Sequence, residues 1–98
     1  MSNPSALLSV LAHPTRLAAL RLLRDAQEHC VCELMGRLGA SQSRMSRHMA
    51  ALRQAGLVVV RRDAQWVRYR LNPALGIEVR RLLDAALDLP VGSERHAA

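Results

Sequence analysis

The two cysteines of the chain, Cys30 and Cys32, are separated by a single residue in the stretch EHCVCELM. Thiolates are the preferred ligands of soft, thiophilic metal centres, so a thiol pair could hold such a centre. On a regular helix, side chains at positions i and i+2 point about 200° apart and cannot both reach one atom. Chelation therefore requires this segment to be extended or distorted. In the alternative interpretation, the two cysteines are small buried hydrophobic residues with no ligand.

The cysteines lie where a short helix is expected to begin. The spacing of the leucines, followed by Gly39, predicts a helix over residues 31–38. A helix N-terminus and nearby cations lower the pKa of a thiol, and Arg24 and Arg37 are close in the sequence. The thiols are therefore expected to ionise readily.

The positive charge of the chain is concentrated in one third of its length. All 14 basic residues are Arg, and residues 41–70 contain seven of them with one acid, Asp63. This window alone accounts for the formal net charge of +6. Nucleic-acid-binding surfaces concentrate charge in this way, whereas an ordinary solvated surface spreads it. Chance clustering is the alternative explanation.

Length and composition narrow the class of protein. The 98 residues suffice for one small domain and leave little room for a catalytic cleft. The histidines and acids show no nucleophile–base or metal-hydrolase spacing, so we expect no enzyme. No apolar run approaches the ~20 residues of a membrane span, and the N-terminus has no signal-peptide pattern. We therefore expect a cytoplasmic protein with no membrane partner.

The elements that would position these residues are helices and one hairpin. Helices are expected over residues 5–12, 13–23, 31–38, 41–55 and in a last segment capped by Asn72-Pro73. Apolar and polar residues alternate over residues 57–71, which predicts a hairpin with residues 63–65 as the turn. Leu57 and Val59 are expected to share one face, and Val67, Tyr69 and Leu71 another. This pattern predicts a mainly α winged helix-turn-helix domain over residues 1–89, which would bind DNA and sense the effector. Residues 90–98 are expected to form a disordered tail.

The fourth expected helix has the composition of a DNA reader. Its apolar side consists of Met45, Met49 and Leu52. The opposite side is small, polar and cationic, as a helix in the major groove requires. The residues expected to contact DNA from this helix are Gln42, Ser43, Arg44, Ser46, Arg47 and His48. The residues expected to contact phosphates from the hairpin are Arg61, Arg62, Gln65 and Arg68.

A family resemblance covers residues 8–83. The stretches LAHPTRLAALRLL, CVCEL, GASQSRMSRHMAALRQAGLV and VRRDAQWVRYRLNP resemble, in order and spacing, the ArsR/SmtB family of metal- and metalloid-responsive repressors. The resemblance implies a homodimer that leaves palindromic operator DNA when its effector binds. It implies base-reading positions at Gln42, Ser43, Ser46 and Arg47. It also implies a dimer interface on the first and last helices, here Leu7, Leu8, Leu11, Leu75, Val79, Leu82 and Ala86. His13 and Ala64 depart from the common Asp and Gly of the family.

Within the family, the thiol stretch resembles that of arsenite and antimonite sensors, whose motif CVCDLC reads CVCELM here. The histidines of the zinc and nickel site on the last helix, and the extra N-terminal cysteines of cadmium and lead sensors, are missing. The resemblance thus implies As(III) or Sb(III) as the effector on Cys30 and Cys32, with no organic cofactor. Met35 replaces the third cysteine, so Met35, His29, glutathione or water could complete the coordination. Binding by the pair is then expected to unwind the start of the helix that supports the DNA reader.

Three alternatives share this fold. The same cysteines could sense cadmium, lead, zinc or mercury. They could instead oxidise, so that the protein responds to redox conditions. The domain could also be a nucleoid or RNA-binding winged helix that senses nothing, in which case binding would be independent of sequence and steeply dependent on salt.

Overall fold

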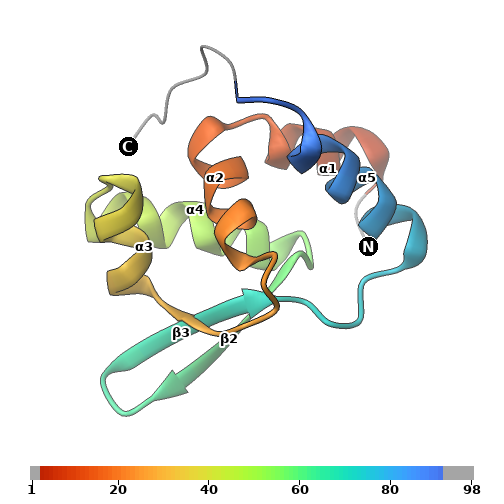
Figure 1. The fold of residues 1–98 in the computed structure, drawn as a ribbon. Helices are drawn as coiled ribbons and strands as arrows, with labels where there is room; N and C mark the ends of the chain where they lie inside the picture. Colours follow the sequence, from red (N-terminus) through yellow and green to blue (C-terminus); the bar gives the residue numbers. More distant parts are fainter. Residues whose placement is uncertain (1–2, 92–98) are drawn as a thin grey trace.

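A computed structural model describes residues 3–91, which fold as a group of helices with a small antiparallel sheet along one edge (Figure 1). In chain order the elements are α1 (Pro4–Leu11), α2 (Pro14–Leu23), β1 (His29–Cys30), α3 (Val31–Leu38), α4 (Gln42–Gln54), β2 (Val58–Asp63), β3 (Trp66–Leu71) and α5 (Ile77–Asp88). Helices α3 and α4 form the helix-turn-helix, and β2 and β3 project from the body as the wing (Figure 1). The predicted winged helix-turn-helix is therefore confirmed.

The ends of α3 and α4 follow from local sequence signals. Gly39 closes α3 with a backbone φ of 65°, in the left-handed region that side-chain-bearing residues avoid. The Ser41 hydroxyl then caps α4 by accepting a hydrogen bond of 3.3 Å from the Arg44 amide. Gly56, at φ 78°, ends the turn that follows α4. The helices expected over residues 31–38 and 41–55 are thus confirmed.

The sheet differs from the prediction in two respects. A short strand, β1, pairs with β3 and places Cys30 opposite Arg68, so the sheet order is β1-β3-β2. Asp63 pairs with Trp66, which leaves a turn of two residues instead of three. Val58 is paired with the buried Leu71, so Val59 lies on the other face from Leu71, as expected.

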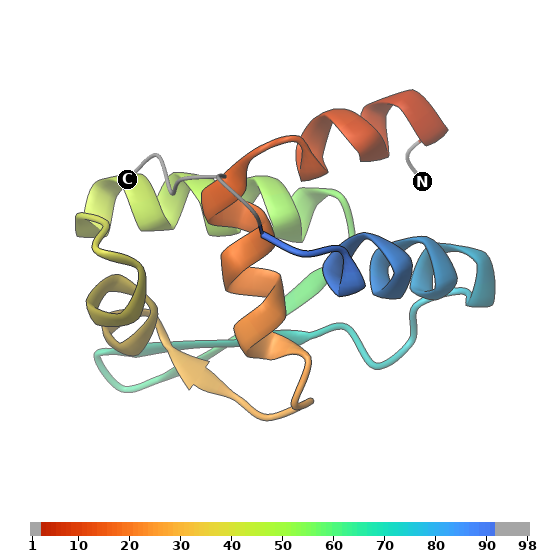
Figure 2. The same cartoon turned by 45° about the horizontal axis from the view of Figure 1, so that its top comes forward.

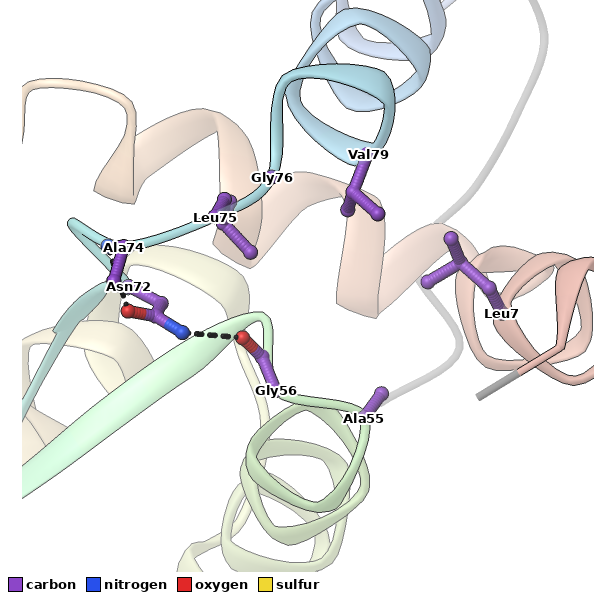
Figure 3. A pocket seen from close by; sticks show the side chains of 8 residues that line it. All are labelled: Leu7, Ala55, Gly56, Asn72, Ala74, Leu75, Gly76 and Val79. Atoms are coloured by element: carbon purple, nitrogen blue, oxygen red, sulfur yellow. Dashed lines mark hydrogen bonds between the residues drawn. The ribbon is translucent and has the colours of Figure 1, made fainter. Parts of the chain in front are cut away.

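The last helix begins later than predicted. The Asn72 carboxamide accepts a hydrogen bond of 2.9 Å from the Ala74 amide, which makes a turn and not a helix cap. Its Nδ2 donates to the Gly56 carbonyl at 2.8 Å and so ties the end of the wing to the end of α4 (Figure 3). Gly76 occupies the N-cap position of α5, and Leu75 therefore precedes the helix.

The core is centred on α2, which lies between α3 and α5 (Figure 2). Leu20 and Leu23 of α2 are fully buried, as are Met45, Met49 and Leu52 on the apolar side of α4. Burial of this side of α4 fixes its rotation, so the opposite side faces outward. Among the described residues no single helix is long and apolar enough to cross a membrane; only α1 and α2 together, bent by 91°, reach that length and composition. Of the expected tail, only residues 90–91 are described, without regular structure; residues 92–98 lie outside the described part.

Candidate DNA-binding surface and thiol site

The outer side of α4 carries the side chains predicted to contact DNA. Five of the six are exposed: Gln42, Ser43, Arg44, Ser46 and Arg47. His48 is half-buried, and its Nδ1 accepts a hydrogen bond of 3.1 Å from Nε of Arg16 on α2. The His48 ring also lies 6.0 Å from that of His13. His48 is thus held against α2, while the other five face solvent.

Each flank of this outer side is hollowed and lined by arginine. The hollow toward α2 is lined by Arg16, Arg44, Arg47 and His48. The hollow toward the wing includes Arg53 of α4 and Arg62 of β2, together with Gln42 and Ser46. Positive charge therefore lies on both sides of α4. Arg16 extends this charge to α2, a helix for which the sequence predicted no DNA contact.

The four predicted wing residues differ in their partners. Arg61 donates from Nε and Nη2 to the two carboxylate oxygens of Glu28, at 2.8 and 2.7 Å. Asp63 lies 3.9 Å from Arg61 and 3.7 Å from Arg68. Arg62 and Gln65 are exposed, and Arg62 has no ion pair within residues 3–91. Glu28 and Arg61 are too far apart in the sequence for any local pattern to reveal their pairing.

The thiols converge without distortion of α3. Cys30 is the N-cap residue, with extended backbone angles (φ −67°, ψ 144°), whereas Cys32 lies in the first turn. Their Sγ atoms are 2.6 Å apart, and both cysteines are free. The expected extended conformation is thus found at Cys30, which stands outside the helix and folds its side chain back over the first turn, so the two sulfurs converge while α3 is intact. Cys30 is half-buried and Cys32 is exposed.

The environment favours ionisation of Cys30. The Cys32 thiol donates a hydrogen bond to Cys30 and so lowers the pKa of Cys30; the Cys32 and Glu33 amides and the Arg68 charge lower it further, against the effect of burial. The same hydrogen bond raises the pKa of Cys32. The nearby cation is Arg68 of the wing, and not the expected Arg24 or Arg37. Those two pair with carboxylates: Arg24 with Asp84 and Asp88, and Arg37 with Glu33.

The two candidates for a third ligand within the chain already have partners. His29 Nδ1 lies 3.0 Å from Glu33 and its Nε2 lies 2.8 Å from Asp25. Burial lowers the pKa of His29, but the hydrogen bonds and charges of these carboxylates outweigh it and raise the pKa. Met35 is half-buried against the core. Across residues 3–91, no three His, Cys, Asp or Glu side chains form a metal site.

The residues predicted for the dimer interface fall into two groups. Leu7 and Leu11 are buried in the core of the chain itself. Leu8 and Leu82 are exposed by 51% and 37%, and Leu75, Val79 and Ala86 are half-buried. Leu7, Leu75 and Val79 line an apolar hollow between α1 and the start of α5 (Figure 3).

Comparison with known proteins agrees with this geometry. Residues 13–60 match the model of the family described as bacterial regulatory protein, arsR family. The chain is 41% identical over 83 residues to the arsenical resistance operon repressor of Escherichia coli K12, covering 85% of this chain and 71% of that protein. It is 44% identical over 87 residues to the arsenic resistance transcriptional regulator ArsR2 of Pseudomonas putida, covering 89% and 76%. The chain belongs to the ArsR family.

Solved structures of other regulators have the same fold as this ArsR-family chain. HlyU from Vibrio cholerae matches with a TM-score of 0.71 and 40% identity, over 84% of this chain and 85% of that one. NolR from Sinorhizobium fredii matches with a TM-score of 0.71 and 36% identity, over 84% and 78%. The ArsR-family chain is accordingly a DNA-binding transcription regulator, in a family of regulators and not of enzymes.

Proposed function

We propose that this protein represses a metalloid-resistance operon and leaves its operator DNA when As(III) or Sb(III) binds the thiolates of Cys30 and Cys32. The observation that carries the proposal is the convergence of these two sulfurs at the start of α3, beside the wing. Similarity to repressors named for arsenical resistance supports the same effector class. Soft thiolate ligands suit such a centre better than the oxygen ligands of the surrounding surface.

The binding step needs no oxidant or reductant. Arsenous acid carries three hydroxyl groups on As(III). Condensation with Cys30 and Cys32 forms two As–S bonds and releases two water molecules. Cys30, whose pKa is lowered, attacks first, and Cys32 follows from the adjacent position. The third position keeps its hydroxyl or exchanges it for an external thiol such as glutathione, since His29 would have to leave two carboxylates and Met35 the core.

The signal has a short path to the DNA-binding surface. Cys30 belongs both to β1, which pairs with the wing strand β3, and to the cap of α3. A centre that binds both sulfurs holds Cys30 in one position relative to the start of α3. Because Cys30 is part of β1, this strand shifts against β3. Glu28, two residues before Cys30, then moves relative to Arg61. The protein then leaves the DNA because the wing and α4 no longer fit it at the same time. In thermodynamic terms, the DNA-free protein binds the effector more tightly than the DNA-bound protein does.

We further propose that the regulator acts in the cytoplasm as a homodimer on a palindromic operator. A second copy would cover the exposed Leu8 and Leu82 and close the apolar hollow between α1 and α5 (Figure 3). A twofold dimer of winged helices places its half-sites about one helical turn, or a multiple of it, apart.

The test is release from operator DNA by the wild type and by the Cys30→Ser and Cys32→Ser variants. Arsenite, antimonite, Cd(II), Hg(II) and hydrogen peroxide are titrated in parallel against each complex, with Met35→Leu as a matched control that keeps both thiols. We expect arsenite and antimonite to release wild type and Met35→Leu, and neither serine variant. A response of both serine variants to arsenite would show that the site is elsewhere. Release by Cd(II) or Hg(II) alone, or by peroxide alone, would identify a different effector on the same cysteines.

A further inference from the structure

The hollow between α2 and α4 contains an arginine that is held in place. Arg16 is half-buried; its Nε donates to Nδ1 of His48 at 3.1 Å, and its Nη1 donates to the Val10 carbonyl at 3.2 Å. These bonds link α2 to α4 and to the last turn of α1. The guanidinium is thus oriented before any ligand arrives, beside Arg44 and Arg47 of the recognition helix.

Three cations meet in this hollow without an acidic partner. Arg16, Arg44 and Arg47 have no ion pair within residues 3–91. By contrast, Arg24 and Arg80 pair with carboxylates of α5. Like charges brought together without a counter-ion repel one another, so an anion that enters the hollow is favoured. The planar fork of Arg matches the oxygens of a phosphate.

The place of the hollow indicates where such a phosphate comes from. The major groove is about 12 Å wide and is bordered by two phosphate backbones. A helix lying in it presents one flank to each backbone. The flank of α4 toward the wing carries the hollow with Arg53 and Arg62, and the opposite flank carries the hollow with Arg16. In this orientation the hollow beside the wing would face one backbone and the hollow with Arg16 the other.

We propose that the hollow lined by Arg16, Arg44, Arg47 and His48 binds a phosphate of the DNA backbone across the groove from the wing, with Arg16 as its fixed donor. This makes α2 a third DNA-contacting element beside α4 and the wing. The inference rests on the DNA binding of the proposed function and is independent of the effector. Because a phosphate contact carries no sequence information, Arg16 adds affinity for all DNA sequences alike.

The test compares Arg16→Gln with Arg81→Gln, which removes the same charge from the exposed surface of α5. Affinity for a selected operator and for unrelated duplex DNA is measured by fluorescence anisotropy across a salt series. We expect Arg16→Gln to reduce the slope of log affinity against log salt by about 0.9 for each Arg16 that the DNA contacts, equally for both DNAs. Arg81→Gln should keep the wild-type slope.

Two further measurements separate a phosphate contact from damage to the fold. Arg16→Lys keeps the charge and should recover most of the slope, although it loses the bond to His48. In a duplex where single phosphates are replaced by neutral methylphosphonates, one position should weaken the wild type and leave Arg16→Gln unaffected. A wild-type slope in Arg16→Gln, or no such position, overturns the proposal. A third result would also overturn it: the free protein binds inorganic phosphate at Arg16, but Arg16→Gln keeps the wild-type affinity for DNA. The hollow would then bind a free anion and not the DNA backbone.

The effector experiment distinguishes the two proposals. Arg16→Gln bound to DNA at low salt should still be released by arsenite, because Cys30 and Cys32 are intact. If arsenite fails to release even the wild type, the effector assignment is wrong and the result for Arg16 stands.

Discussion

Replacing Glu28 by Gln should strengthen DNA binding and weaken its control by the effector. In the wild type the Glu28 carboxylate accepts two short hydrogen bonds from Arg61, at 2.8 and 2.7 Å. The Arg61 guanidinium lowers the pKa of Glu28, so the carboxylate is ionised at neutral pH. One of the wing arginines is therefore neutralised by the segment that leads into Cys30. Gln keeps the shape of Glu and removes its charge.

The size of the effect follows from the number of phosphate contacts. Arg61 is 53% exposed, so it can turn to a phosphate once the charge of Glu28 is gone, since its remaining acidic neighbour, Asp63, is farther away at 3.9 Å. Each additional contact steepens the slope of log affinity against log salt by about 0.9, so one in each subunit of a dimer steepens it by about 1.8. Between 50 and 200 mM salt, this is an additional loss of affinity of about 3.5-fold per contact. At the lower salt concentration the variant should bind more tightly than wild type by a comparable factor.

The assay is fluorescence anisotropy with operator DNA over a salt series, followed by titration of the complex with arsenite. Glu78→Gln is the matched control, because Glu78 is exposed in the first turn of α5. We expect a steeper slope and a higher arsenite midpoint for Glu28→Gln only. A wild-type slope together with a wild-type midpoint would refute the idea that the Glu28–Arg61 pair links the thiol segment to the wing.

Three other predictions concern the thiols, the helix-turn-helix and the dimer. Cys32→Ala removes the hydrogen bond that lowers the pKa of Cys30, so alkylation of Cys30 by iodoacetamide should move to higher pH; an unchanged profile contradicts this. Gly39→Ala places a Cβ in open space but in the left-handed conformation at φ 65°, so the free energy of unfolding should fall by roughly 1–2 kcal/mol and Tm by about 4–8 °C per kcal/mol. An unchanged Tm in calorimetry would contradict this. Leu82→Glu puts a charge on the exposed apolar side of α5 and should give monomers in light scattering, while a persistent dimer would place the interface elsewhere.

The helix boundaries were predictable because their signals are local. Gly39 and Gly56 adopt positive φ values, and Ser41 caps α4 within its own turn, so neighbouring residues contain the necessary information. The apolar side of α4 followed from spacing for the same reason. The start of α5 was misplaced because Asn72 is a suitable cap by type, yet its side chain closes a turn and bonds to Gly56.

The thiol site was only half predictable. The sequence indicates that Cys30 and Cys32 lie at the start of α3 and that one of them must leave the regular helix for both to reach one atom, but it does not indicate that Cys30 is the residue that does so. Cys30 is held in an extended conformation by pairing with Arg68, which lies 38 positions along the chain. A strand of two residues has no periodicity of its own, so no local pattern could reveal it. The same holds for Glu28 and Arg16, whose partners come from distant elements.

The small size of β1 suits it to switching. Its pairing with β3 involves His29 and Cys30 alone, so few hydrogen bonds oppose a shift of this strand. Elements with few bonds and partial exposure move at low free-energy cost, whereas the buried contacts of α2 with α4 resist movement. A centre bound to Cys30 and Cys32, as proposed, would therefore act where the fold is weakest, and the adjoining residues on β3 and β2 are the wing arginines Arg68 and Arg61. In this proposal the effector site and the wing belong to one small sheet, so a displacement would reach the DNA-binding surface without passing through the core.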